Sequence, residues 1–145
     1  MCSPSQVHRY LARISGPLLD RIDLQIEVTA VNVEELSKRE NAEPSSAIRN
    51  RIQSARKRQL ARYGNEERVY ANGQMAPRQV RRYCLLDRES QKLIKMAIRR
   101  LGLSARAYDR ILKVSRTIAD LAGSEAIRAQ HVSEAVQYRS LDRNW

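Results

Sequence analysis

The chain has 145 residues and a mass of 16.7 kDa, which suits one ordinary domain, or a small domain with an extension, and excludes a large multidomain enzyme. Hydrophobic residues make up 42% of the chain and aromatic residues 5%, with five Gly, four Pro and no Phe, so the core must be aliphatic and helices should dominate over the many turns of an all-β sandwich. The net charge of +11 favours a polyanionic partner such as nucleic acid or nucleotide phosphates.

Cysteine content and hydropathy indicate a cytoplasmic protein. The two Cys residues provide no disulfide framework, and no apolar run approaches the roughly 18 residues that span a bilayer. The N-terminal residues have neither the basic start nor the apolar stretch of a secretory signal.

The net charge of the chain also has a second explanation, because a piece of a longer chain can carry charge that its other parts balance or cover.

The positive charge is concentrated in the C-terminal part of the chain. Residues 1–43 carry 5 basic and 7 acidic side chains, whereas residues 44–145 carry 22 basic and 9 acidic ones. Such asymmetry predicts two pieces with different neighbours, and the stretch around Pro44 has few apolar residues, as a boundary should.

The first piece predicts a helix followed by a strand. An apolar face with spacings of four and three predicts a helix over residues 5–14, which the Gly16-Pro17 pair stops. From residue 22 to residue 28 apolar and polar residues alternate, as in a half-exposed or edge strand. A lone strand cannot satisfy its own backbone, so we expect its sheet to lie in residues that precede this chain.

The second piece is predicted to be helical. It begins with a helix over residues 45–63, with Ser45 or Ser46 as N-cap and Gly64 at its end. The stripe expected to face the core contains Ile48, Ile52, Ala55, Gln59 and Tyr63. A polar loop over residues 65–76 then leads to a short helix over residues 77–83, with Pro77 at its first position.

Basic side chains flank the stripe of the first long helix on both sides. They are candidates for nucleic-acid contact together with a cluster in the short helix, and the alternative is an ordinary solvated surface with long side chains lying along it. The candidate residues are Arg49, Arg56, Lys57, Arg58, Arg62, Arg78, Arg81 and Arg82.

Three further helices complete the chain. Asp87 caps a helix that runs to Leu101, and Gly102 followed by the cap Ser104 forces an αα-hairpin with the next helix, over residues 105–122. The last helix covers residues 129–139. The inward face of the second of these helices contains Tyr108, Ile111, Leu112, Ser115, Ile118, Ala119 and Ala122, and the opposite face contains Arg106, Arg110 and Lys113.

Motifs that bind nucleotides or metals are absent from this sequence. It contains no phosphate-binding loop, no dinucleotide fingerprint and no paired Cys or His at metal-ligand spacing. His8 and His131 are expected to have surface or packing roles, and Cys84 is expected to be a small buried hydrophobe. We therefore do not expect this chain to catalyse a reaction by itself.

Long segments of the chain resemble the C-terminal part of the magnesium-chelatase-like AAA+ ATPases of the ComM/YifB family. These segments are Cys2-Ser-Pro-Ser-Gln-Val-His-Arg-Tyr-Leu, Ser15-Gly-Pro-Leu-Leu-Asp-Arg-Ile-Asp-Leu, Gly102-Leu-Ser-Ala-Arg-Ala-Tyr-Asp-Arg-Ile-Leu-Lys-Val-Ser-Arg-Thr-Ile-Ala-Asp-Leu-Ala-Gly-Ser-Glu and Ala135-Val-Gln-Tyr-Arg. The resemblance covers nearly the whole chain. In that family the Walker motifs lie upstream, which agrees with the absent phosphate loop and the lone strand.

The resemblance assigns a role to Arg21. Residues 18–24 resemble the segment that enters the last strand of the ATPase sheet and carries an arginine finger. Such a guanidinium acts in trans, where it stabilises the charge on the γ-phosphoryl group in an adjacent subunit, an effect of about 10³- to 10⁵-fold. The alternative from the residues alone is a local ion pair of Arg21 with Asp20 or Asp23.

The resemblance also assigns a role to the start of the helix over residues 105–122. Arg106 matches the sensor-2 position, where an Arg contacts the γ-phosphate in its own subunit, and Arg110, one turn on, is the second candidate. The helix N-terminus adds unpaired N–H groups and the positive end of the helix dipole. The alternative is a solvated basic face.

Cys2 resembles the last member of a Cys cluster, but its companions are missing from this sequence and no metal site is expected.

Taken together, the sequence predicts a mainly α protein. Residues 44–145 are expected to form a helical AAA+ lid domain, and residues 1–43 to be a helix-strand remnant of the AAA+ α/β core. The resemblance implies the function of the lid and sensor-2 segment of an ATP-driven ring motor that acts on DNA in branch migration or competence. ATP and magnesium are expected to be bound by the full-length protein and not by this piece. This piece should be inactive alone. The alternative is a stand-alone basic helical module that binds nucleic acid without nucleotide chemistry, and magnesium insertion into a porphyrin depends on the family label alone.

Overall fold

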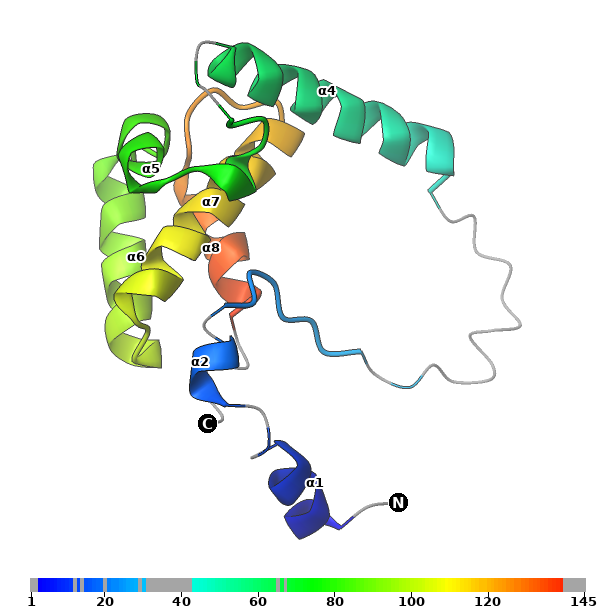
Figure 1. Ribbon diagram of the computed structural model, residues 1–145, viewed down its shortest axis with the longest axis vertical. Coiled ribbons are helices and arrows are strands. Elements are labelled where there is room, and N and C mark those ends of the chain that lie inside the picture. Colours follow the sequence, from blue (N-terminus) through cyan, green and yellow to red (C-terminus); the bar gives the residue numbers. More distant parts are fainter. Residues whose placement is uncertain are drawn as a thin grey trace.

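The computed structural model describes residues 3–11, 13, 15–19, 21–28, 30, 43–64, 66 and 68–139. This part of the chain is helical, which confirms the predicted fold class (Figure 1). The only β feature within it is an isolated bridge between Leu86 and Ile127. The helices are α1 (Pro4–Leu11), α2 (Gly16–Leu19), α4 (Ser45–Tyr63), the 3₁₀ helix η1 (Asn72–Gln74), α5 (Pro77–Tyr83), α6 (Arg88–Leu101), α7 (Ala105–Leu121) and α8 (Ala129–Gln137).

Helices α6 and α7 are joined by the predicted capped turn, but they do not pack on each other as the predicted hairpin, because α6 packs mainly on α8. The Asp87 carboxylate accepts a hydrogen bond from the Ser90 N–H at 2.8 Å, and the Ser104 hydroxyl accepts one from the Ala107 N–H at 3.1 Å. Each cap satisfies one of the N–H groups that a helix start leaves without a partner. Between them Gly102 has a φ of 63°, the left-handed conformation that ends α6 and reverses the chain.

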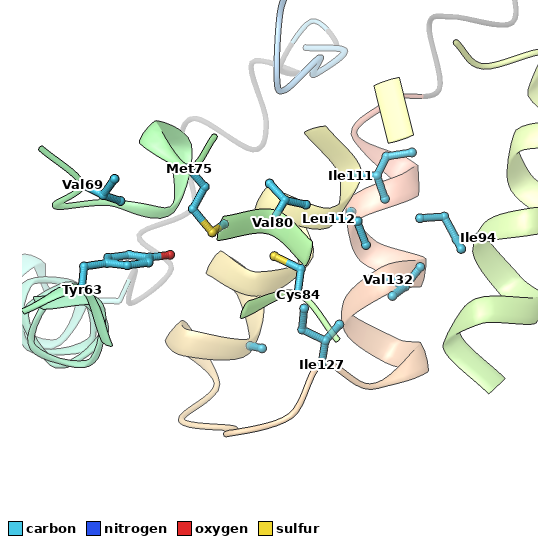
Figure 2. Close-up of a cluster of buried hydrophobic side chains, with 12 residues drawn as sticks. Tyr63, Val69, Met75, Val80, Cys84, Ile94, Ile111, Leu112, Ile127 and Val132 are labelled. Carbon is cyan, nitrogen blue, oxygen red and sulfur yellow. The ribbon is translucent and has the colours of Figure 1, made fainter. Parts of the chain in front are cut away.

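Helix α7 is the centre of the fold. It packs against α4, α5, α8 and η1, while α6 packs mainly on α8. The buried side chains that join these helices are mostly aliphatic, as the composition requires, and Figure 2 shows how they meet. They are Tyr63, Val69, Met75, Val80, Cys84, Ile94, Ile111, Leu112, Ala119, Ile127, Val132 and Ala135.

Only the C-terminal half of α4 belongs to this core. Ala55, Gln59 and Tyr63 are buried, but Ile48 and Ile52 are 37% and 50% exposed. The prediction that the whole stripe faces the core is wrong for these two positions, because the N-terminal half of α4 extends beyond the helices it could pack against (Figure 1). Neither predicted serine caps the helix, since Pro44 occupies the cap position and supplies no side-chain acceptor.

The polar loop predicted after α4 contains structure and buried groups. Val69 and Met75 lie in the core, and Asn72 begins η1 with 1% of its surface exposed. The Asn72 side chain accepts a hydrogen bond from the Tyr63 hydroxyl at 2.7 Å. The high polar content of this segment concealed a buried turn that fills the space between α4 and α7.

The N-terminal piece differs from its prediction in two respects. Residues 22–28 form no strand, because none of the described residues provides a second extended segment beside them to complete a ladder. Gly16 and Pro17 begin α2 rather than only ending the first helix, as suits Pro in a first helical turn. Cys2, Ile14, Asp20 and residues 31–42 lie outside the described residues, as does most of the predicted boundary stretch.

Candidate functional site

The first turn of α7 presents Arg106 to solvent. Arg106 is the second residue of the helix and its side chain is exposed, as the sequence predicted. The Ser104 hydroxyl caps the Ala107 N–H, whereas the N–H groups of Ala105 and Arg106 have no acceptor among the described residues. A guanidinium beside two free N–H donors at the positive end of a helix is a donor set that suits a phosphate group.

Arg110, one turn later, is held by the N-terminal piece. Its guanidinium forms an ion pair with the Asp23 carboxylate, and 24% of the Arg110 side chain remains exposed. The same helix face contains Lys113, whose ammonium donates to the Gly73 carbonyl at 3.1 Å. Of the predicted cationic face of α7, only Arg106 is therefore free of protein partners within the described residues.

Arg21 lies in the turn after α2, two residues before Asp23. Its side chain is exposed and forms no ion pair with Asp23, which contacts Arg110 instead. The segment is tied to the helical body at two further points, because the Gln25 N–H donates to the Tyr138 carbonyl at 2.9 Å and the Arg139 guanidinium donates to the Ile22 carbonyl. The segment that follows Arg21 is thus placed beside Arg110 of α7 and the end of α8.

A cleft lies where this segment crosses α7 and α8. It has a volume of about 280 Å³ and is mostly apolar, with Asp23, Leu24, Lys113, Ile118 and Tyr138 among its lining residues. None of Arg21, Arg106 and Arg110 lines it. This cleft therefore does not place any of the three predicted phosphate-contacting arginines against a bound ligand.

Neither a metal-binding cluster nor a membrane-spanning helix occurs among the described residues. No group of three or more His, Cys, Asp or Glu side chains is placed to hold a metal ion. No described helix is both long enough and apolar enough to cross a bilayer.

A buried ionic cluster between α4, η1 and α7 includes one of the predicted nucleic-acid contacts. Asp120 is 1% exposed and accepts hydrogen bonds from Arg62 at 2.8 Å and from the Asn72 amide at 2.8 Å. Arg116, which is 3% exposed, forms an ion pair with the same carboxylate at 3.1 Å. The Arg62 side chain is only 17% exposed, so its charge serves the fold.

The cluster determines the ionisation of its members. The hydrogen bond to Asp120 raises the pKa of Arg62, whereas burial lowers the pKa of Arg116. Arg116 also donates to the carbonyls of Ser124 and Glu125, both at 2.7 Å. The two carbonyl contacts of Arg116 offset part of the cost of placing two cations around one buried carboxylate, although its Nε has no hydrogen-bond acceptor among the described residues.

The other candidates for nucleic-acid contact lie on the surface. Two of these side chains have protein partners, since Arg56 donates to the Tyr70 carbonyl at 3.2 Å and Arg82 forms an ion pair with Glu66 at 3.1 Å. The remaining exposed candidates are Arg49, Lys57, Arg58, Arg78 and Arg81. They are spread around α4 and α5 and do not converge on one face.

The outer side of α6 is a basic surface that the sequence pattern did not single out. Arg88, Lys92, Lys95 and Arg99 are all exposed. Their spacing of four, three and four residues was visible in the sequence, but only the apolar arc of this helix was used to predict the fold.

The histidine and cysteine predictions can be compared with the structure at two positions. The buried His131 accepts a hydrogen bond from the Arg128 N–H at 3.0 Å, and burial lowers its pKa. Cys84 lies in the core, where burial raises the pKa of its thiol to about 12. Both side chains have packing roles, as predicted.

Comparison with known proteins shows similarity along almost the entire chain. The family model for the C-terminal part of magnesium chelatase subunit ChlI matches residues 42–139, and the model for magnesium chelatase subunit ChlI matches residues 1–36. The chain is 41% identical over 143 residues to the uncharacterized protein YifB of Escherichia coli, and 41% identical over 142 residues to the competence protein ComM of Haemophilus influenzae. It is 30% identical over 139 residues to an uncharacterized protein of Mycobacterium tuberculosis. These alignments cover 96% to 98% of this chain but only 27% of each relative.

Proposed function

Because the chain belongs to the magnesium-chelatase-like family that includes YifB and ComM, we propose that it is the C-terminal segment of an AAA+ ATP-driven ring motor that acts on DNA. Residues 44–145 serve as the helical lid, and residues 1–43 belong to the ATPase core. The motor acts in branch migration or a competence-related process. It self-associates into a ring in the cytoplasm.

The observation that carries this proposal is the arrangement at the start of α7. Arg106 is exposed beside two N–H groups that have no acceptor among the described residues, and these donors can bind the γ-phosphate of ATP. Arg110 is the second contact, which becomes available when its ion pair with Asp23 opens. Most of the nucleotide and its Mg²⁺ are held by residues outside this chain, where Mg²⁺ neutralises charge on the phosphates.

Arg21 acts as the arginine finger in a neighbouring subunit. Its guanidinium is exposed and Asp23 does not neutralise it, so it can extend to a phosphate across a subunit boundary. An Arg suits this role because its planar guanidinium stays charged and can donate two parallel hydrogen bonds to an anionic group.

The test is the ATPase turnover of full-length variants that carry Arg21→Ala or Arg106→Ala. Both side chains are exposed, so both variants should keep their melting temperatures. Turnover should fall by about 10³-fold or more for Arg21→Ala, the usual effect of removing an arginine finger, and strongly for Arg106→Ala. The matched control is Arg49→Ala, which removes an exposed arginine from α4 and should leave turnover unchanged. Unchanged turnover in the two site variants would remove both role assignments.

Mixing subunits tests the action in trans. Arg21→Ala subunits should regain turnover when they are mixed with subunits disabled in the phosphate-binding loop, because some boundaries then join an intact loop to an intact arginine. Failure of the mixture to exceed both parents would show that Arg21 does not act across a subunit boundary.

A further inference from the structure

Helix α6 carries a straight row of cations on the side opposite the core. At about 100° per residue, Arg88, Lys92, Lys95 and Arg99 fall within about 60° of one another. The buried residues of α6, among them Ser90 and Ile94, lie on the other side. The row is about 16 Å long from its first to its last cation, and neighbouring residues of the row are separated by about 4.5 to 6 Å along the helix axis.

This row is not neutralised by the fold. None of its four members forms an ion pair among the described residues, whereas Arg51 and Arg62 of α4 are paired with Glu43 and Asp120. The acidic residue of α6, Glu89, projects about 60° beyond the edge of the row.

Neighbouring residues extend the basic surface. Lys92, Lys95, Met96, Arg99 and Arg100 border a shallow hollow of about 500 Å³. On the other side of the row, Arg81 of α5 lines a second hollow together with Lys95. Asp109 also borders that second hollow, so the field there is weaker than over the α6 row.

The chemistry of the surface favours the sugar-phosphate backbone of a duplex. Aligned cations attract a line of phosphates with little regard to base sequence. Proteins that hold single strands also use aromatic side chains, on which the bases stack, and α6 contains no aromatic residue. Binding that does not depend on sequence suits a motor that moves along its track.

We propose that the outer face of α6, formed by Arg88, Lys92, Lys95 and Arg99 with Arg100 beside it, binds the phosphate backbone of duplex DNA. This inference rests on the proposed function for DNA as the polyanion. It assigns the contact to α6 and not to the spread cations of α4.

The test compares two triple variants of this chain that remove the same charge. Lys92→Gln/Lys95→Gln/Arg99→Gln removes the row, and Arg49→Gln/Lys57→Gln/Arg58→Gln removes three exposed cations from α4. Affinity for a labelled duplex of about 20 base pairs is measured by fluorescence anisotropy between about 50 and 200 mM salt, because phosphate contacts appear as a salt dependence. Circular dichroism establishes that both variants keep the wild-type helix content.

The row variant should bind at least about tenfold more weakly at 100 mM salt, and its slope of log affinity against log salt should fall by about 2 to 3, one for each phosphate that the variant no longer neutralises. The α4 variant should weaken binding by less than about threefold, and Lys92→Arg/Lys95→Arg/Arg99→Lys should bind like the wild type, since each retains the phosphate-binding charge.

Several outcomes would overturn the inference. Equal reductions of affinity in the two triple variants would show that only net charge matters, and a wild-type chain that binds no duplex at about 50 mM salt would remove the contact altogether. Row-dependent binding to vesicles with about one third phosphatidylserine, without duplex binding, would assign the row to a membrane surface. None of these outcomes changes the ATPase result for Arg106→Ala, so the two proposals can fail separately.

Discussion

At the scale of single residues, Asp120 is the group on which the packing of α4 depends. It contacts Arg62 from α4, Asn72 from η1 and Arg116 from its own helix. The pattern of α7 did not reveal this role, because an Asp among apolar residues near a helix end is more often solvated. The sequence predicts Arg62 as a nucleic-acid contact for the same reason. It does not reveal that the partner of Arg62 in the fold is Asp120, which lies 58 residues later in the sequence.

Asp120→Asn should destabilise the chain strongly. The amide keeps the shape but leaves two arginines without a counter-charge in a buried site, and breaking such a pair costs about 3 to 5 kcal/mol. Urea denaturation followed by circular dichroism measures the decrease in stability. Arg82→Gln is the matched control, because it removes one partner of an exposed ion pair and should change the urea midpoint much less. Similar decreases in the free energy of unfolding of both variants would show that the buried cluster contributes no more to stability than an exposed ion pair.

At the scale of helices, the structure agrees most closely with the sequence where capping residues mark the ends. Asp87, Gly102 and Ser104 define the α6–α7 turn by local chemistry, and each has the predicted role. The prediction failed where an end or a face depends on distant contacts. The sequence assigns Ala122 to the buried side of α7, but it is exposed as the C-cap of that helix. Ile48 is exposed because no described helix packs on that half of α4.

Gly102→Ala should destabilise the chain through the turn between α6 and α7. A Cβ at this position would meet no atom within 4 Å, so the cost comes from the left-handed backbone and amounts to about 1 to 2 kcal/mol. Gly102→Asn should cost less, since Asn tolerates this conformation. Thermal unfolding of the two variants measures the difference, and equal destabilisation would point to a packing effect instead.

At the scale of the whole molecule, the N-terminal piece is attached through residues 22–25. The interactions that hold it include Asp23 with Arg110, the Gln25 N–H with the Tyr138 carbonyl, and Arg139 with the Ile22 carbonyl. The family resemblance assigns Arg21 to a phosphate in an adjacent subunit and Arg106 to a phosphate in its own subunit, but it does not predict the ion pair between Asp23 and Arg110. The alternating pattern of residues 22–28 describes a segment suited to a sheet, and without neighbouring strands it lies on the helices.

Asp23→Asn should loosen this attachment without unfolding the helices. A partly exposed ion pair contributes about 0.2 to 1 kcal/mol, so hydrogen exchange at the Gln25 amide should become about 1.4- to 5-fold faster. Amides in the middle of α7 should keep their protection. Glu27→Gln is the control within the same segment, because Glu27 is exposed and has no ion pair among the described residues. Unchanged exchange in Asp23→Asn would show that the backbone hydrogen bonds suffice.

The connection between Arg62 and Asp120 has a consequence for biosynthesis. A ribosome that adds about 5 to 20 residues per second completes α4 roughly 3 to 12 s before the carboxylate that neutralises Arg62 is made, given their separation of 58 residues. During that interval Arg62 lacks its carboxylate partner, although Asn72 and Tyr83, which contact Tyr63, are made earlier than Asp120. The final docking of α4 on α7 therefore waits for translation of the end of α7, since both Arg62 and its partner Asp120 must be present.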